Sequence, residues 1–298
     1  MGFGDGSRAL RDGAGGCVLA RDVLRASGPD ALSFLQGQLS QDVEALDVGQ
    51  SAFSLLLQPQ GKVDALLRVT RTADDEVVLD TDAGWGEAVQ TRLARFKLRV
   101  RCELEPLDWR CLAVRGAAST DLPATPEGTW RVLPETPGIP GFDLLGRDPA
   151  LPPGVTLVDD EAYEALRIET GVPRMGFELD ATTIPATAGV VERTVSFTKG
   201  CYTGQELVAR IDSRGGNVPR RLRGVVASAD GAVPPLGAEV VVGAKVVGTL
   251  TSLGYSGLRR APVALAYVRR DVEPPVDVVL RWDGGEASAR VEVLPLGR

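Results

Sequence analysis

Residues 199–206 read Lys-Gly-Cys-Tyr-Thr-Gly-Gln-Glu, and the assignment of the whole chain starts from this stretch. Thr203 and Glu206 lie three residues apart just before an apolar run, a spacing typical of a capping box, which predicts a helix that begins at Thr203. Backbone N–H groups, the helix dipole and the cation of Lys199 would all favour a thiolate at Cys201. Cys201 and Lys199 are therefore the candidate catalytic residues. The alternative is a buried structural cysteine.

The rest of this stretch and the segment after it offer candidate ligands for a cofactor. Tyr202 either stacks on a flat ring or fills the core. An arginine cluster follows in this otherwise acidic chain: Arg210, Arg214, Arg220, Arg221 and Arg223. Guanidinium groups pair bidentately with carboxylates, so the cluster suits a ligand that bears them; a solvated charge run is the alternative. The candidate cofactor-binding residues here are Tyr202, Gln205, Glu206 and Arg210.

Arg167 and Glu169 are two further candidate cofactor-binding residues, upstream of this stretch. They lie near the end of a predicted helix that Asp159 or Asp160 caps and Gly171 ends. A carboxylate there can accept hydrogen bonds from an amino group and an adjacent ring N–H, the edge that a pterin presents. A surface salt bridge is the alternative.

Composition narrows the classes of function. The 298 residues, 44% hydrophobic and 24% charged, are typical of a folded globular protein. A net charge of −7 argues against broad electrostatic binding to nucleic acid or to an anionic membrane. The absence of histidine excludes histidine-based nucleophile pairs and metal sites, and the four cysteines contain no Cys-x-x-Cys pair, so we expect no metal site. The sequence shows neither a membrane-spanning apolar run nor a signal peptide, which predicts a cytoplasmic protein.

Composition also divides the chain. Residues 1–16 are rich in glycine and charge, and we expect a flexible tail there. Residues 17–220 mix strand-like runs with helices, which predicts an α+β body of two subdomains. In residues 221–298, short β-rich runs recur between Gly and Pro turns, a pattern typical of a small antiparallel barrel.

Other motifs accompany the signature in a fixed order. They are Gly-Pro-Asp-Ala at 28–31, Phe-Leu-Gln-Gly-Gln at 34–38, Gln-Pro-Gln-Gly-Lys at 58–62, Arg-Ile-Glu-Thr-Gly at 167–171 and Ile-Pro at 184–185. With them, residues 20–295 resemble the YgfZ family. The fold of that family is similar to that of the glycine-cleavage aminomethyltransferase, called T-protein. The resemblance thus implies an α+β folate-binding body followed by a C-terminal antiparallel β-barrel.

The resemblance also implies a function. It suggests that tetrahydrofolate, or a one-carbon derivative of it, binds in a central channel, and that the protein assists the assembly or repair of iron–sulfur enzymes, including those that modify tRNA. By the same resemblance Glu169 contacts the pterin and Cys201 carries the family's function. The expected partners are folate and iron–sulfur client or assembly proteins, without nucleic acid or membrane, for a monomer. A folate-dependent one-carbon transferase and a non-catalytic folate-binding adaptor remain the alternatives.

One departure from the T-protein pattern bears on the reaction. The T-protein branch places an aspartate pair after Gly-Gly-x-x, whereas Asp64 is followed here by Ala65. Because side chains alternate between the faces of a strand, we expect Asp64 to point away from the place where that carboxylate is needed. This disfavours aminomethyl transfer, and whether the protein is an enzyme at all stays open.

Overall fold

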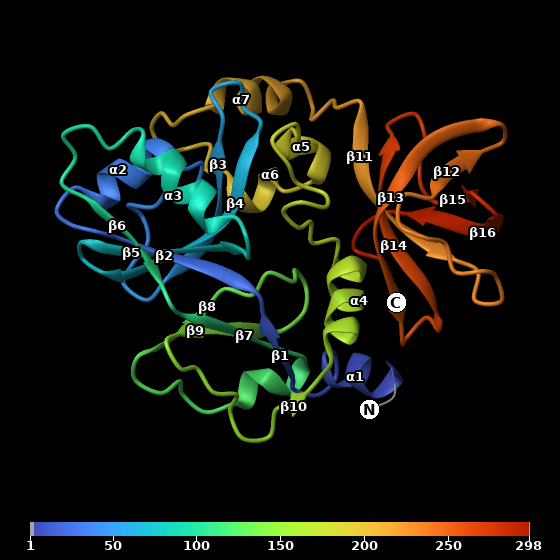
Figure 1. The fold of residues 1–298 in the computed structure, drawn as a ribbon, viewed down its shortest axis with the longest axis horizontal. Coiled ribbons are helices and arrows are strands. Elements are labelled where there is room, and N and C mark those ends of the chain that lie inside the picture. Colours follow the sequence, from blue (N-terminus) through green and yellow to red (C-terminus); the bar gives the residue numbers. More distant parts are fainter. Residues whose placement is uncertain (1–2, 298) are drawn as a thin grey trace.

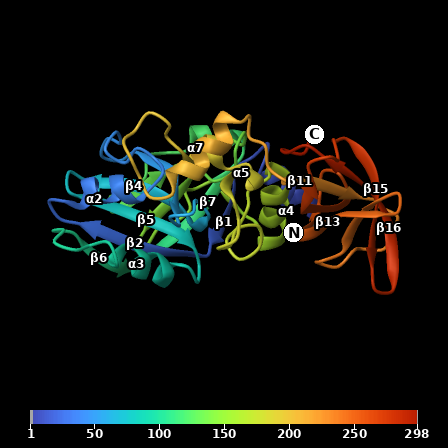
Figure 2. The same ribbon diagram turned by 90° about the horizontal axis from the view of Figure 1, so that it is seen from above.

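A computed structural model describes residues 3–297 of the protein, which form two five-stranded sheets and a closed barrel. The two sheets lie together at one end of the molecule and the barrel lies at the other, with helix α4 (Asp160–Thr170) between them (Figure 1). The view from above shows the same elongated arrangement (Figure 2). No helix in the described part of the chain is long and apolar enough to cross a membrane.

The first sheet is antiparallel and has the strand order β3-β4-β5-β2-β6. Its strands are β2 (Arg21–Ser27), β3 (Ser51–Leu57), β4 (Val63–Ala73), β5 (Glu76–Asp82) and β6 (Glu103–Leu107). Helices α2 (Ala31–Gln38) and α3 (Gly86–Ala94) contribute Leu35 and Leu93 to its core, where both side chains are fully buried. This core is the largest in the body because the apolar residues of β3, β4 and β5 all meet there.

The second sheet has the order β10-β1-β7-β9-β8, and only its β1–β10 pair is parallel. Its strands are β1 (Gly15–Leu19), β7 (Arg110–Arg115), β8 (Thr129–Val132), β9 (Gly141–Gly146) and β10 (Thr156–Leu157), and a 3-10 helix follows β7 at Ala117–Asp121. Since β1 leads directly into β2 of the first sheet, the two sheets meet at residue 20.

The barrel is a six-stranded antiparallel structure that closes between β11 and β16. Its strands are β11 (Arg220–Ala227), β12 (Glu239–Val242), β13 (Lys245–Ser256), β14 (Ala261–Arg269), β15 (Val276–Trp282) and β16 (Gly285–Glu292). Small and branched apolar side chains fill its interior, among them Val240, Leu280 and Val291, all fully buried. The predicted C-terminal antiparallel barrel is confirmed.

The expectation of a flexible tail over residues 1–16 is wrong for the described residues. Helix α1 (Phe3–Ala9) packs on α4, strand β1 begins at Gly15, and Leu10 is fully buried. Glycine serves close packing here: a Cβ atom added to Gly6 would lie 2.9 Å from the Cβ atom of Ala162 in α4. Composition alone does not distinguish a glycine that permits motion from one that permits two helices to approach.

Three short helices carry the chain from the body to the barrel. They are α5 (Pro185–Ala188), α6 (Val191–Thr194) and α7 (Gln205–Ser213). Seen from above, α7 and α5 lie on the surface and lead toward β11 (Figure 2). The signature loop, residues 199–204, therefore lies on the body, just before α7.

Candidate functional site

Helix α4 packs between the body and the barrel. The Asp159 side chain caps it by accepting a hydrogen bond from the Ala162 N–H at 2.8 Å, and Gly171 ends it in the left-handed conformation (φ 74°). Ile168, fully buried, packs with Leu222 of the barrel. Because both ends are capped and this face is buried, the opposite face of α4 is held rigidly toward the second sheet.

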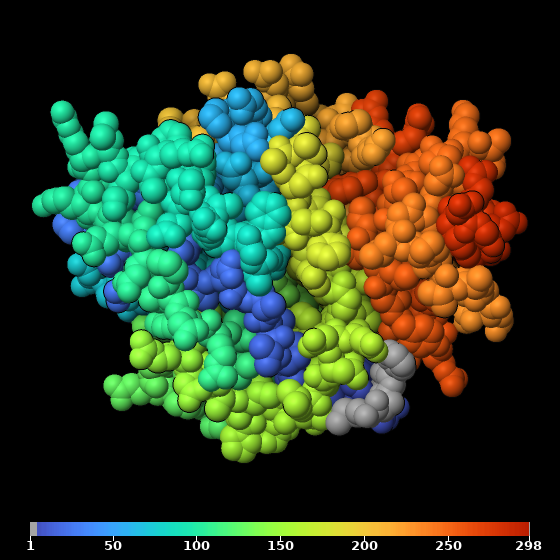
Figure 3. Space-filling view, in the orientation of Figure 1, coloured from blue at the N-terminus to red at the C-terminus, as the bar shows by residue number. Residues whose placement is uncertain are grey.

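A cavity of about 700 Å³ lies on that opposite face. Its walls are β1, the end of β5, α4, residues 174–177 and β13, so body and barrel both contribute. Apolar side chains such as Val18, Met175 and Phe177 alternate there with charged ones. Figure 3 shows a hollow in the middle of this face, bordered by blue and yellow-green segments. We call this space the central cavity.

Arg21 holds one wall of the central cavity. Its guanidinium donates to Asp80 at 2.8 Å and to Asp82 at 2.8 Å, and it lies 3.7 Å from a Glu135 carboxylate oxygen. The second oxygen of Asp82 accepts a hydrogen bond from the Met175 N–H at 2.9 Å. Both oxygens of Asp82 are therefore engaged, and this carboxylate is not a free base.

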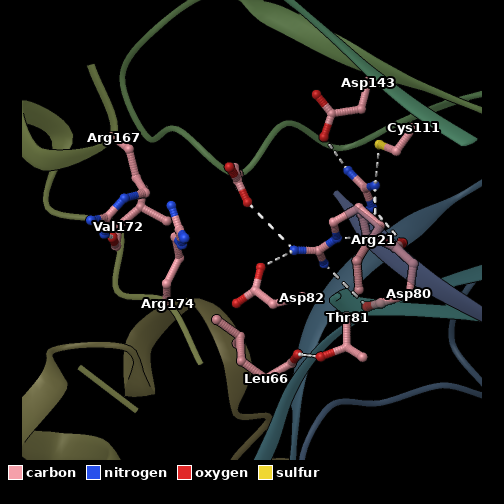
Figure 4. Close-up of polar contacts among 12 residues, drawn as sticks. Arg21, Leu66, Asp80, Thr81, Asp82, Cys111, Asp143, Arg167, Val172 and Arg174 are labelled. Carbon is pink, nitrogen blue, oxygen red and sulfur yellow. Dashed lines mark hydrogen bonds and ion pairs between the residues drawn. The ribbon is translucent and has the colours of Figure 1, made fainter. Parts of the chain in front are cut away.

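A buried ionic network extends from Arg21 into the body (Figure 4). Arg68 binds Asp80 bidentately at 2.9 and 3.0 Å and also pairs with Asp143, which Arg115 binds at 2.5 Å. Burial opposes ionisation of Asp143, but the charges of Arg115 and Arg68 outweigh it and lower the pKa of that carboxyl. Every carboxylate in the network contacts at least one arginine.

The opposite wall carries a second ion-paired group. Arg167 donates to both oxygens of Glu164, at 2.8 and 2.7 Å, and Arg174 donates to the same carboxylate at 3.0 Å. Burial raises the pKa of Glu164, yet these hydrogen bonds and charges lower it overall. In Figure 4, Arg167 and Arg174 face Asp82 and Arg21 across the space between the walls. Arg167 thus lines the cavity, but its charge is already paired.

Glu135 has one carboxylate oxygen that accepts no hydrogen bond from the described residues. One oxygen accepts a hydrogen bond from the Tyr163 hydroxyl at 2.9 Å, whereas the other has only the 3.7 Å ion pair with Arg21. Its backbone is fixed as well, since Arg193 donates to the Glu135 carbonyl at 2.9 Å and Arg68 donates to the Leu133 carbonyl at 2.8 Å. This second oxygen can accept hydrogen bonds from a ligand with N–H donors.

Glu169 does not line the central cavity, which corrects the expectation that it lies there with Arg167. Residues two apart on a helix point in nearly opposite directions. Glu169 pairs with Arg11 on the far side of α4, beside a separate pocket of about 280 Å³. Its neighbours there include Arg259 of the barrel. Glu169 is thus ion-paired, but in a largely buried position and not in the surface salt bridge that the sequence left open.

The signature loop packs against two other motifs. The Thr203 N–H donates to the Gly37 carbonyl at 3.3 Å, and a Cβ atom on Gly204 would lie 2.4 Å from the Gln58 carbonyl oxygen. Gly204 has φ 83° and is the N-cap of α7, which begins at Gln205 without a side-chain cap. The predicted capping box at Thr203 is therefore wrong. The close approach of the Gln58 turn, rather than a capping side chain, sets where this helix begins.

Lys199 fastens the loop to the end of α2. Its ammonium donates to the carbonyls of Gln36, Leu39 and Gln41 at 2.5, 2.7 and 3.0 Å, and it lies 5.2 Å from the centre of the Tyr202 ring. These three acceptors use all three N–H donors of the ammonium. Because its protons are directed at α2, Lys199 can act on the Cys201 thiol only through its charge, and that role stays a prediction. Burial lowers the pKa of Lys199 to about 8.

Cys201 is the exposed member of the four cysteines. Cys17, in the cavity wall, and Cys102 and Cys111 are buried, and burial raises the pKa of each thiol, to about 12 for Cys111. A thiol in solvent reacts faster than one held protonated in the core. Among the described residues, no group of three or more Cys, Asp or Glu side chains is arranged to hold a metal ion.

The other candidate ligands of the signature region do not line the central cavity. Tyr202 packs at the edge of the body core, and its N–H donates to the Gln205 side-chain oxygen at 3.2 Å. Glu206 and Arg210 are exposed on α7. The structure thus separates two groups that the sequence prediction combined: Arg167 lines the cavity, whereas the signature residues lie elsewhere, at the surface of the body.

Asp64 lies apart from both sites. It pairs with Arg92 at 3.1 Å in a groove beside α3 and does not line the central cavity. The residues that the sequence prediction missed are Arg21, Asp82, Glu135 and Arg174. Arg21 and Asp82 are terminal residues of β2 and β5, where charged side chains are common, and Glu135 lies in a Pro-rich connection, so the sequence carried no distinct signal for these three.

Comparisons with known proteins agree with this architecture. The family model described as the GCVT N-terminal domain matches residues 19–127, and that of the glycine cleavage T-protein C-terminal barrel domain matches residues 220–296. The crystal structure of the glycine cleavage system aminomethyltransferase T from Bartonella henselae superposes with a TM-score of 0.83, covering 99% of this chain and 90% of that one. At 23% identity this likeness shows the fold alone.

Relatives of this chain with similar sequences have three different names. An aminomethyltransferase of Thermus thermophilus is 32% identical over 90% of this chain and 82% of its own length. The iron-sulfur cluster assembly factor IBA57 of Mus musculus is 29% identical, over 84% and 76% of the two chains. The tRNA-modifying protein YgfZ of Klebsiella pneumoniae is 28% identical, over 90% and 88%.

These matches define a class of protein in which a two-sheet body precedes a C-terminal barrel. The chain belongs to the glycine-cleavage T-protein family. Its relatives include YgfZ and IBA57 proteins, which agrees with the YgfZ resemblance that the signature indicated. The predicted fold class is confirmed as well.

Proposed function

We propose that the central cavity binds tetrahydrofolate or a one-carbon derivative, and that the protein acts in the cytoplasm, as a monomer, in the assembly or repair of iron–sulfur clusters. Residues 17–220 form the folate-binding region in this proposal, and the barrel of residues 221–298 closes the cavity. The names of the IBA57 and YgfZ relatives support the iron–sulfur and tRNA-modification context.

The Glu135 carboxylate oxygen that accepts no hydrogen bond within residues 3–297 is the observation that carries the folate proposal. A pterin presents adjacent N–H donors, and a fixed, partly desolvated carboxylate is a suitable acceptor for them. The cavity volume of about 700 Å³ lies in the usual range for small-molecule sites, and its mixed apolar and charged lining suits a flat ring with a charged tail.

Arg174 is the proposed contact for the glutamate end of folate. Its side chain is 40% exposed, and its guanidinium carbon lies 4.6 Å from the centre of the Phe177 ring. One of its N–H groups donates a hydrogen bond to Glu164. Its remaining N–H groups can pair with a carboxylate at the mouth of the cavity. Glu135 and Arg174 would thus bind the two ends of one ligand.

The one-carbon transferase alternative has less support. Asp64 lies in a different groove, Asp82 has both oxygens engaged, and two arginines hold Glu164. A transferase would need a carboxylate placed to take a proton from its substrate, and none of these three meets that need. We therefore favour a role without aminomethyl transfer, in which folate binds at the cavity and Cys201 acts at the surface.

Three measurements test this proposal. Calorimetry with tetrahydrofolate should show binding to the purified protein, and alkylation mapped by mass spectrometry should label Cys201 before Cys17, Cys102 and Cys111 because only its thiol is exposed. In a deletion strain, Cys201→Ser should fail to restore iron–sulfur enzyme activity while folate affinity is unchanged. Full rescue by the serine variant would favour the adaptor alternative, and no folate binding by a cooperatively folded protein would refute the cavity assignment.

A further inference from the structure

The mouth of the central cavity carries two carboxylates that no arginine neutralises. Asp160 and Glu161 lie in the first turn of α4, line the cavity and are exposed to solvent. Within residues 3–297 neither side chain forms an ion pair or accepts a hydrogen bond. Acidic residues are common in the first turn of a helix because the helix dipole favours them there. Their position at the cavity adds a consequence for any charged ligand that enters it.

The geometry of α4 places these two carboxylates beside the proposed contact for the glutamate end of folate. Glu164 lies four residues after Asp160 and three after Glu161, so the three side chains share one side of the helix. Arg174 donates a hydrogen bond to Glu164 at 3.0 Å. Side chains three or four residues apart on a helix are neighbours, with Cβ atoms about 5–6 Å apart. A ligand carboxylate that pairs with Arg174 therefore lies close to Asp160 and Glu161.

Little positive charge is left at the mouth to offset these carboxylates. Three arginines line the cavity, and the side chains of Arg21 and Arg167 are only 8% and 2% exposed and already ion-paired. The third, Arg174, is exposed, but it is ion-paired with Glu164. Against these three guanidinium groups the lining contains five carboxylates, those of Asp82, Glu135, Asp160, Glu161 and Glu164. The cavity can thus pair one glutamate of a ligand with Arg174, but its lining offers no cation to a further glutamate.

We propose that the mouth of the central cavity selects folates that carry a single glutamate over folates with a polyglutamate tail. Each γ-linked glutamate added to the tail contributes one more negative charge. These charges would lie beside Asp160 and Glu161 rather than beside a cation, so the repulsion grows with the length of the tail. Asp160 and Glu161 are specificity-determining residues in this proposal, which rests on the proposed binding of folate in the cavity and defines which form of it binds.

Calorimetric titration of the protein with tetrahydrofolate monoglutamate and with its triglutamate form tests the selection. At low salt we expect the triglutamate to bind about three- to tenfold more weakly, because exposed like charges repel modestly but additively. The ratio of the two dissociation constants should approach one as the salt concentration rises, since salt screens exposed charges. Attraction of the tail to Arg174 would have the opposite sign. Tighter binding of the triglutamate at low salt would therefore overturn the proposal.

Variants assign the selection to the first turn of α4. Asp160→Asn with Glu161→Gln should bring the ratio of dissociation constants to within about twofold of one. Glu161→Gln alone should lower the ratio partway if the double variant proves unstable. The matched control is Asp230→Asn with Asp283→Asn, which removes the same charge from two exposed residues outside the cavity lining that form no ion pair in the described chain. The control should leave the ratio unchanged.

Two further outcomes separate this inference from the proposed function. An unchanged ratio in the folded double variant of α4 would overturn the tail selection and leave folate binding in place. Failure of the folded wild type to bind either form of tetrahydrofolate would refute the folate site itself, and the tail selection with it.

Discussion

The central cavity and the signature loop are held in place by different kinds of interaction. The cavity wall is a network of buried charges, in which Arg68 and Asp143 are about 1% exposed and are held by several ionic partners. The loop is held by main-chain contacts and by Lys199, and it leaves Cys201 in solvent. A cavity wall whose side chains are each fixed by several ion pairs suits recognition of a rigid ligand. An exposed thiol on a tethered loop suits contact with another protein.

The largest effect should come from breaking the network beneath the cavity. Arg68→Met leaves Asp80 and Asp143 short of a buried partner, and we expect a loss of about 3–5 kcal/mol in the free energy of unfolding. Urea denaturation measures it. Arg281→Met, which breaks an exposed pair with Glu239, is the matched control and should cost at most about 1 kcal/mol. Similar losses in both variants would mean that the network is not the stabilising feature.

Folate affinity should distinguish the two carboxylates that have been considered for the pterin. Glu135→Gln keeps the size and the Tyr163 contact but removes the charge, and should weaken tetrahydrofolate binding by about 1.5–3 kcal/mol. Glu169→Gln, on the far side of α4, should leave affinity unchanged in the same calorimetric titration. The reverse pattern would return the pterin contact to Glu169.

The two glycines of the signature should differ in their tolerance of alanine. Gly204 has a positive φ and no room for a Cβ atom, so Gly204→Ala should cost about 1–3 kcal/mol of unfolding free energy. Gly200 has no neighbour within 4 Å, and Gly200→Ala should be neutral within about 0.5 kcal/mol. Thermal unfolding of the two variants compares them directly. Equal costs would show that the turn at Gln58 does not press on the loop.

The smallest effect concerns the pH dependence of the loop's anchor. Burial lowers the pKa of Lys199 to about 8 from its usual value of 10.5, so the unfolded chain binds more protons between these values. The free energy of unfolding of the wild type, relative to Lys199→Met, should therefore rise as the pH increases from 8 to 10.5. Chemical denaturation at several pH values measures the difference. A fall over this range would mean that the three carbonyl contacts raise the pKa instead.

Several features of this protein follow from sequence alone because they depend on local patterns. The turn-bounded β runs after residue 220 predict the barrel, and the motifs led by residues 199–206 identify the family. The C-terminal end of α4 at Gly171 is equally local, since a left-handed residue there suits glycine. The exposure of Cys201 also agrees with its place in a glycine-flanked loop.

Only the tertiary structure decided which charged residues share a site. Arg21 and Glu135 are 114 positions apart, and no periodicity relates a strand residue to a Pro-rich connection. The side of α4 on which Glu169 lies depends on which face the barrel buries, and the start of α7 depends on the approach of the Gln58 turn to Gly204. Local propensity specifies elements and their ends, whereas long-range packing and charge pairing choose which side chains meet, because these energies arise only when distant segments are brought together.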